Sequence, residues 1–136
     1  MTAAASSSEA GSNGTPAAPS RMSERTGRPA LRLAAADLGT DLGERATLVQ
    51  FSSAFCAPCR ATRQLLRDIA AKEPGITYAE IDAESHLGLV RRLHILRTPT
   101  VLVLDADGDI ATRASGLPRR SDVVAAVRSV CQSGVR

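Results

Sequence analysis

A short strand pattern that leads through two closely spaced cysteines into a helical pattern limits the possible folds more than any other feature. Residues 46–52, ATLVQFS, form an apolar and β-branched run that predicts a buried strand. Cys56 and Cys59 follow, with Ala-Pro between them. Residues 59–72 then predict an amphipathic helix, because their apolar side chains recur at helical spacing. These side chains are Leu65, Leu66, Ile69 and Ala70.

Strand and helix patterns alternate along the rest of the chain. We predict a short strand near 31–33, a helical turn before Arg45, strands at 75–83, 99–105 and 109–115, a tight turn at 105–108, a helix over 86–93 capped by Ser85, and a last helix after Pro118. A strand–helix–strand start implies parallel pairing through a right-handed crossover, and the closing hairpin adds an antiparallel strand. We therefore expect an α/β fold in a single domain, with one mixed central sheet flanked by helices on both faces.

The first residues of the chain differ in composition from the rest. They are mainly Ala, Ser, Gly, Pro and Thr, and such a segment buries too little apolar surface to offset the entropy lost on ordering. We predict a disordered tail at 1–29 and a globular domain at 30–136. The core of this domain must be built from Leu, Val, Ile and Ala, because Phe51, Phe55 and Tyr78 are the only aromatic residues.

Charge and hydropathy argue against nucleic acid and membranes as partners. The formal net charge is +3, and the arginines are spread along the chain without a basic stripe or stacking aromatic residues. No run approaches the roughly 20 apolar residues of a membrane span. The N-terminal segment lacks the early positive charge and the apolar run of a secretion signal, and it carries Glu9 instead. We expect a monomeric, cytoplasmic protein.

Three interpretations of the cysteine pair compete, and two of them fit the chain poorly. A zinc site needs two further ligands, and the remaining candidates, Cys131, His86 and His94, lie in different elements. We therefore expect no metal. A static disulfide across so short a loop stabilises weakly and does not persist in a reducing cytoplasm. Cys131 lies on the apolar face of the last predicted helix, where a cysteine is usually part of the core.

A redox-active pair accounts for more of the residues. The predicted strand delivers Cys56 to the start of a helix, where unpaired N–H groups and the helix dipole favour its thiolate. Pro58 occupies the first helical turn, where its missing N–H costs nothing. Cys59 lies one turn further along, within disulfide reach and more covered. Arg60 adds a positive charge beside the thiols, whereas Arg63 and Arg67 are expected on a solvated helix face.

At this point the chain resembles the thioredoxin family. LVQFSSAFCAPCR (48–60) is similar to the strand, active site and helix of that family, and RTPTVLVLDADG (97–108) is similar to its second signature, a cis-proline facing the cysteines. The resemblance implies a thioredoxin fold, with Cys56 as the attacking cysteine and Cys59 as the resolving one. It implies that Pro99 is the cis-proline, that the Thr98 backbone binds an extended substrate segment, and that Gly116 matches a glycine of the family.

The resemblance also implies a function. The chain would be a thiol–disulfide oxidoreductase that reduces protein disulfides through a Cys56–Cys59 cycle. It would bind no cofactor and would be regenerated with NADPH through a thioredoxin reductase-like electron donor. Its partners would be disulfide-bearing proteins. The substrate-binding residues would be Phe55, Ala57, Pro58, Thr98 and Pro99.

Two departures from the family pattern bear on the proton chemistry. Gln50 stands where thioredoxins carry a buried aspartate beneath the active site, and an amide does not titrate. Glu80 stands where the next strand of the family carries a lysine, and we do not assign it as a replacement base. Two alternatives remain open, a redox-sensing thioredoxin-like binding module and an extracytoplasmic thiol reductase of the membrane-tethered or secreted type.

Overall fold

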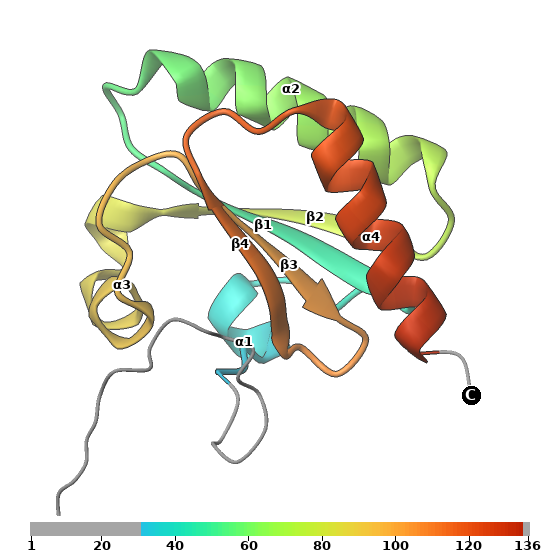
Figure 1. Ribbon diagram of the computed structural model, residues 1–136. Coiled ribbons are helices and arrows are strands. Elements are labelled where there is room, and N and C mark those ends of the chain that lie inside the picture. Colours follow the sequence, from blue (N-terminus) through green and yellow to red (C-terminus); the bar gives the residue numbers. More distant parts are fainter. Residues whose placement is uncertain (1–30, 135–136) are drawn as a thin grey trace, which may run out of the picture. The chain divides into compact units, whose positions relative to one another are not determined.

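A four-stranded mixed sheet with a hydrophobic core on each face organises residues 31–134, the part of the chain that the computed structural model describes (Figure 1). The strand order is β2-β1-β3-β4. The strands are β1 (Ala46–Ser52), β2 (Ile76–Asp82), β3 (Thr100–Asp105) and β4 (Ile110–Ser115). β1 pairs parallel with β2 and antiparallel with β3, and β3 pairs antiparallel with β4. This is the predicted α/β architecture.

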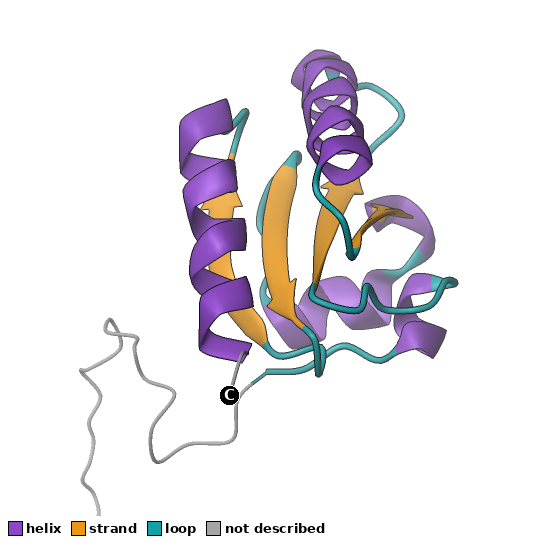
Figure 2. Cartoon of the chain, turned by 90° about the vertical axis from the view of Figure 1, so that its right-hand side faces the viewer, coloured by secondary structure: helices purple, strands orange, loops and turns teal. Residues whose placement is uncertain are grey.

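Two helices pack on each face of the sheet, as Figures 1 and 2 show. One core lies under α2 (Ala57–Lys72) and α4 (Arg120–Gly134), and the other lies under α1 (Ala35–Leu38) and α3 (Leu87–Leu93). Successive side chains of β1 alternate between the two cores: Leu48 joins the first, whereas Val49 and Phe51 join the second. Because both faces are covered, every residue of β1 is buried, including the polar residues Thr47, Gln50 and Ser52.

The strand over 46–52 is confirmed to the residue, whereas several other boundaries differ. The helix predicted from Cys59 already begins at Ala57, because Cys56 is its N-cap and Pro58 is tolerated in the first turn. Near residue 32 there is a single bridge from Arg32 to Asp109 and no strand. Proline lacks a ladder donor, and β3 starts at Thr100, one residue after Pro99.

The prediction that Ser85 caps α3 is wrong. Ser85 lies in a one-turn 3₁₀-helix, Ala83–Ser85, and its hydroxyl donates to the Asp82 carboxylate over 2.8 Å. Asp82 also accepts the backbone N–H of Glu84 and so caps this short turn. The residue before α3 is His86. The Ser85 hydroxyl therefore donates to Asp82, and Ser85 does not cap α3.

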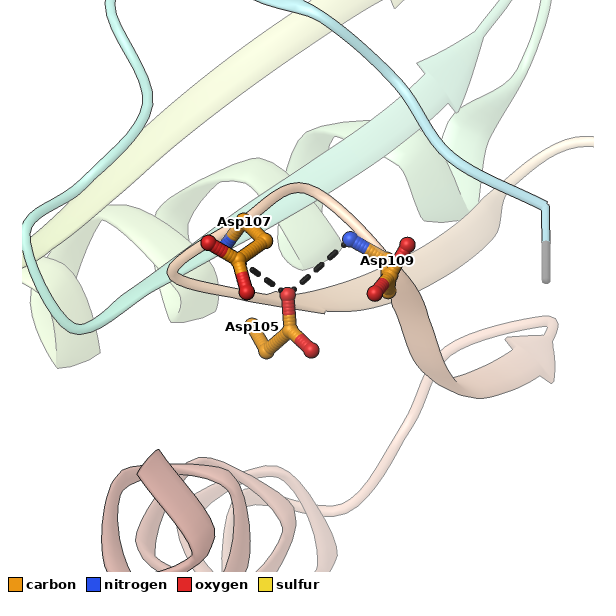
Figure 3. Close-up of side chains that lie close together, drawn as sticks. All are labelled: Asp105, Asp107 and Asp109. Atoms are coloured by element: carbon orange, nitrogen blue, oxygen red, sulfur yellow. Dashed lines mark hydrogen bonds between the residues drawn. The ribbon is translucent and has the colours of Figure 1, made fainter. Parts of the chain in front are cut away.

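The turn between β3 and β4 gathers Asp105, Asp107 and Asp109, which we call the acidic turn (Figure 3). Asp105 Oδ1 accepts the backbone N–H of Asp107 over 2.9 Å and that of Asp109 over 3.0 Å. Asp109 is paired with Arg32, whose Nε lies 2.7 Å from Oδ1. The turn therefore closes on itself, and the carboxylates of Asp105 and Asp109 are engaged.

The predicted tail at 1–29 lies outside the described residues. Within 31–134, no helix combines the length and the apolar character that crossing a membrane requires.

Candidate functional site

The two cysteines form a disulfide at the start of α2. Their Cα atoms are 5.3 Å apart, and the backbone N–H of Cys59 donates to the Cys56 carbonyl over 3.1 Å. The N-cap residue Cys56 is partly exposed, whereas Cys59 is 1% exposed beneath the first turn. The pair thus has one sulfur that an incoming group can reach and one that is covered.

The start of a 16-residue helix surrounds Cys56 with groups that favour a thiolate. Pro58 has no N–H and that of Cys59 is used within the turn, so the Ala57 N–H is the one left at the helix start, where the helix dipole is positive. Both stabilise negative charge on a sulfur at the N-cap. The exposed Arg60 side chain lines the same open hollow as Ala54, Phe55, Cys56 and Ala57. Phe55 is 97% exposed and presents a bare apolar ring beside the pair.

A second loop lies against the cysteine loop. The Thr98–Pro99 peptide bond is cis, and Thr98 Oγ1 is hydrogen-bonded to Ser53 Oγ over 3.1 Å. On the other side, the backbone N–H of Gly116 donates to the Pro99 carbonyl over 2.7 Å. Gly116 has a φ of 86°, which glycine adopts without strain. Three segments far apart in the sequence therefore meet at one end of the sheet.

Gln50 is completely buried, and both ends of its amide have partners. Its Nε2 donates to the Cys59 carbonyl over 2.9 Å, and its Oε1 accepts the Tyr78 hydroxyl over 2.8 Å. Burial, and after it the negative charge of Glu80, raise the pKa of Tyr78 to about 12, so that the hydroxyl remains protonated. Gln50 therefore connects β1 and β2 to the helical turn that carries Cys59.

Glu80 is committed to a second set of contacts. It accepts two hydrogen bonds from the Arg63 guanidinium, at 2.9 and 2.7 Å, and one from the Ser52 hydroxyl at 2.7 Å. The hydrogen bonds from Arg63, more than that from Ser52, hold the pKa of this carboxyl below its ordinary value. An ionised and fully engaged carboxylate is a weak proton acceptor, and Glu80 is therefore no base for Cys59.

The expectation that Arg63 belongs to a solvated face is wrong, because its side chain is only 33% exposed and its guanidinium is paired with Glu80. Arg67 is exposed, yet its guanidinium lies over the Tyr78 ring, 5.6 Å from the centroid. The interface of β1, β2 and α2 thus contains two neighbouring sets of hydrogen-bonded polar side chains, which we together call the sheet–helix network. Its members are Gln50, Ser52, Arg63, Tyr78 and Glu80.

Sequence reasoning missed Tyr78, Ser52 and Arg63 as members of the site. One signal was present in the chain. Tyr78 and Glu80 are two residues apart on a strand and so point to one face, and Gln50 is the register partner of Glu80. The register of β1 with β2 could not be predicted from the sequence, because parallel strands are joined through a helix and no hairpin turn sets their alignment.

The other candidates take no part in this site. Cys131 is 7% exposed in the core under α4, as predicted. His86 and His94 lie at the two ends of α3 as its caps. Within 31–134, the only group of three potential metal ligands is the acidic turn, which does not include the cysteines. The turn lies at the opposite end of β1, because Asp105 is the register partner of Ala46.

Comparison with known proteins gives a consistent result. A family model described as Thioredoxin matches residues 33–129. Thioredoxin domain-containing protein 2 of Mus musculus is 35% identical over 60 residues, which are 44% of this chain and 12% of that protein. Thioredoxin of Chlamydia pneumoniae is 31% identical over 70 residues, 52% of this chain and 68% of that protein.

The structural similarity concerns the fold. A mutant thioredoxin from Halobacterium salinarum superposes with a TM-score of 0.60 at 20% identity, over 70% of this chain and 80% of that one. The chain spans between 11% and 50% of the length of the first three curated relatives.

Proposed function

The chain belongs to the thioredoxin family, and from this premise we propose that it is a thiol–disulfide oxidoreductase that reduces protein disulfides through Cys56 and Cys59. One observation carries the proposal. A partly exposed cysteine at the N-cap of α2 is bonded to a covered cysteine three residues later, next to a loop with a cis-proline. This arrangement supplies a nucleophile, a resolving thiol and a surface for an extended chain.

The reaction consists of two thiol–disulfide exchanges. The Cys56 thiolate attacks one sulfur of a substrate disulfide; that S–S bond breaks, and the other substrate sulfur leaves as a thiolate that takes up a proton. Cys59, deprotonated by solvent, then attacks the Cys56 sulfur of the mixed disulfide. The second substrate thiolate leaves and the Cys56–Cys59 bond forms. The substrate gains two electrons and two protons, and the chain loses them.

Substrate binding is assigned to the surface around the exposed sulfur. Phe55, Ala57 and Pro58 are exposed on one side of the disulfide. The half-buried Thr98 and the buried Pro99 belong to the loop that is hydrogen-bonded to Ser53, and we assign the backbone next to the cis bond to binding an extended segment. An apolar ring with neighbouring backbone donors and acceptors suits an unfolded or looped protein segment.

The remaining parts of the proposal follow the family. The partners are disulfide-bearing proteins and an NADPH-linked reductase that regenerates the dithiol. The chain itself acts as a cytoplasmic monomer without a bound cofactor, and Arg60 strengthens the positive field at the thiols.

An insulin-reduction assay with dithiothreitol as electron source tests the proposal. We expect the wild-type chain to accelerate the reaction, Cys56→Ser to abolish the acceleration, and Cys131→Ala to retain it, because Cys131 lies in the core away from the pair. A wild-type chain as inactive as Cys56→Ser contradicts the enzyme and leaves the redox-sensing binding module. Elemental analysis of the purified protein is a second measurement. One zinc per chain in the wild type that is absent from Cys56→Ser would contradict a free redox pair.

A further inference from the structure

We propose that Tyr78 is a positioning residue of the redox site, which acts through Gln50 on the helical turn that carries Cys59. The proposal deepens the function proposed above and rests on it. Neither residue touches the sulfur atoms in the described contacts. The chain of contacts runs from the Tyr78 hydroxyl through the Gln50 amide to the Cys59 carbonyl.

A completely buried amide is held in one orientation by its partners. Gln50 is 0% exposed, and water is not available to replace a lost contact. The Cys59 carbonyl can only accept, so the amide end facing it has to be Nε2, and the amide oxygen is left to accept the Tyr78 hydroxyl. Without this hydroxyl the amide oxygen has no described partner. The tyrosine thus holds the far end of the amide and keeps Nε2 directed at the Cys59 carbonyl.

Tyr78 is itself well fixed for this task. Its pKa of about 12 keeps the hydroxyl protonated, and so able to donate, at neutral pH. Its ring lies beneath the Arg67 guanidinium and packs against the core under α2. Both the donor group and the position of the ring are therefore constant.

The consequence concerns the reduced state. When the disulfide opens, the hydrogen bond from Gln50 still ties the Cys59 carbonyl to β1, so that Cys59 remains close to Cys56. This restraint lowers the conformational entropy of the dithiol and raises the effective concentration of one thiol at the other. Closure of the disulfide, which also releases the substrate, is favoured. Loss of the restraint shifts the equilibrium toward the dithiol.

The test is the equilibrium of the Cys56–Cys59 pair with reduced and oxidised glutathione, read by thiol alkylation and mass. We expect Tyr78→Phe to favour the dithiol about three- to tenfold, and tenfold corresponds to about 30 mV. Thr47→Val is the matched control. It also removes one hydroxyl from a buried hydrogen bond of β1, that of the Gly43 N–H to Thr47 Oγ1 at 2.8 Å, and it lies at the other end of the strand. Its equilibrium is expected within about twofold of wild type.

A double-mutant cycle separates positioning from a general loss of stability. Gln50→Met keeps the volume of the side chain and removes its polar atoms, so we expect a shift at least as large as that of Tyr78→Phe. The double variant is expected to shift no further than Gln50→Met alone, because Tyr78 acts through Gln50.

Two results overturn the inference: a Tyr78→Phe equilibrium equal to that of Thr47→Val, or additive shifts in the double variant. The measurement uses glutathione and no protein substrate. A chain that fails to reduce insulin therefore still gives an equilibrium constant, and the two proposals fail separately.

Discussion

The two ends of β1 each gather polar side chains, but the two groups are covered differently. The sheet–helix network lies at the carboxyl end, between the strands and α2, and Gln50 within it is completely buried. The acidic turn (Figure 3) lies at the amino end. There Asp107 is exposed, and Asp109 pairs with the exposed Arg32. Both groups bring polar side chains close together, but only the sheet–helix network contains a completely buried one, Gln50.

This difference determines what each group can position. Inside the network, each hydrogen bond joins residues at least nine positions apart and connects different elements, and Gln50 has no water to compete with. In the acidic turn, the hydrogen bonds of Asp105 join residues within four positions, and they only shape the loop. The contacts of Gln50 in the network reach the Cys59 carbonyl. No hydrogen bond described for 31–134 connects the acidic turn to the cysteines.

The largest effect on stability is expected for Gln50→Met. The substitution leaves the half-buried Tyr78 hydroxyl without its acceptor and removes one donor from the Cys59 carbonyl, where Gln50 is completely buried. We expect a loss of about 1–3 kcal/mol in the free energy of unfolding. Urea denaturation of the reduced protein measures it. If Gln50→Met lowers the free energy of unfolding no more than substitutions in the acidic turn do, the two ends of β1 do not differ as described.

Glu80→Gln tests the charged part of the network and its pH dependence. The pKa of Glu80 lies below its ordinary value of 4.5 in the folded chain, mainly through the hydrogen bonds from Arg63. The folded state therefore binds fewer protons than the unfolded state, and the stabilisation is fully present above about pH 4.5 and is lost as the pH falls through the folded pKa.

At neutral pH we expect Glu80→Gln to cost about 1–2 kcal/mol. Urea denaturation at a series of pH values follows the difference from wild type, which should be constant above pH 5 and shrink in more acidic solution. A difference that persists unchanged into the acid range contradicts an ionised Glu80 as its source.

How far the sequence predicts this molecule depends on how local each feature is. The strand 46–52 and the cysteine pair are predictable. A strand buried on both faces is rich in apolar and β-branched residues, and Pro58 marks the start of the helix. The position of Gln50 beneath the site follows from resemblance. Its partner Tyr78 does not, because the strand that carries it pairs across a helical crossover.

Arg63 illustrates a second limit. A helical projection places it opposite the apolar face of α2, and this alone indicates a solvated residue. The long side chain nevertheless reaches over the edge of the helix to Glu80 on β2. The burial of Arg63 depends on the length of its side chain and on the neighbouring strand β2, and a helical projection contains neither.

Asp105→Ala sharpens the comparison from the other end. It removes the oxygen that accepts two backbone N–H groups, so we expect about 1 kcal/mol of destabilisation. The glutathione equilibrium of the cysteine pair should stay within about twofold of wild type, as measured by the same alkylation assay. A shift as large as that of Tyr78→Phe would show that the turn does act on the site.

The smallest effect is expected for Asp109→Asn. Its ion pair with Arg32 is exposed, with the arginine side chain 60% accessible, so we expect less than about 1 kcal/mol. Added salt should reduce the difference from wild type further, because the pair is screened. Thermal denaturation at low and high salt measures this, and a salt-independent loss contradicts a screened surface pair.

The short span of the Cys56–Cys59 bond has a consequence for recognition. Only three positions separate the bonded residues, so opening or closing the bond alters one helical turn and links no distant parts of the chain. We therefore expect the oxidised and reduced forms to differ in surface mainly at that turn. A partner that distinguishes the two forms is expected to contact that turn.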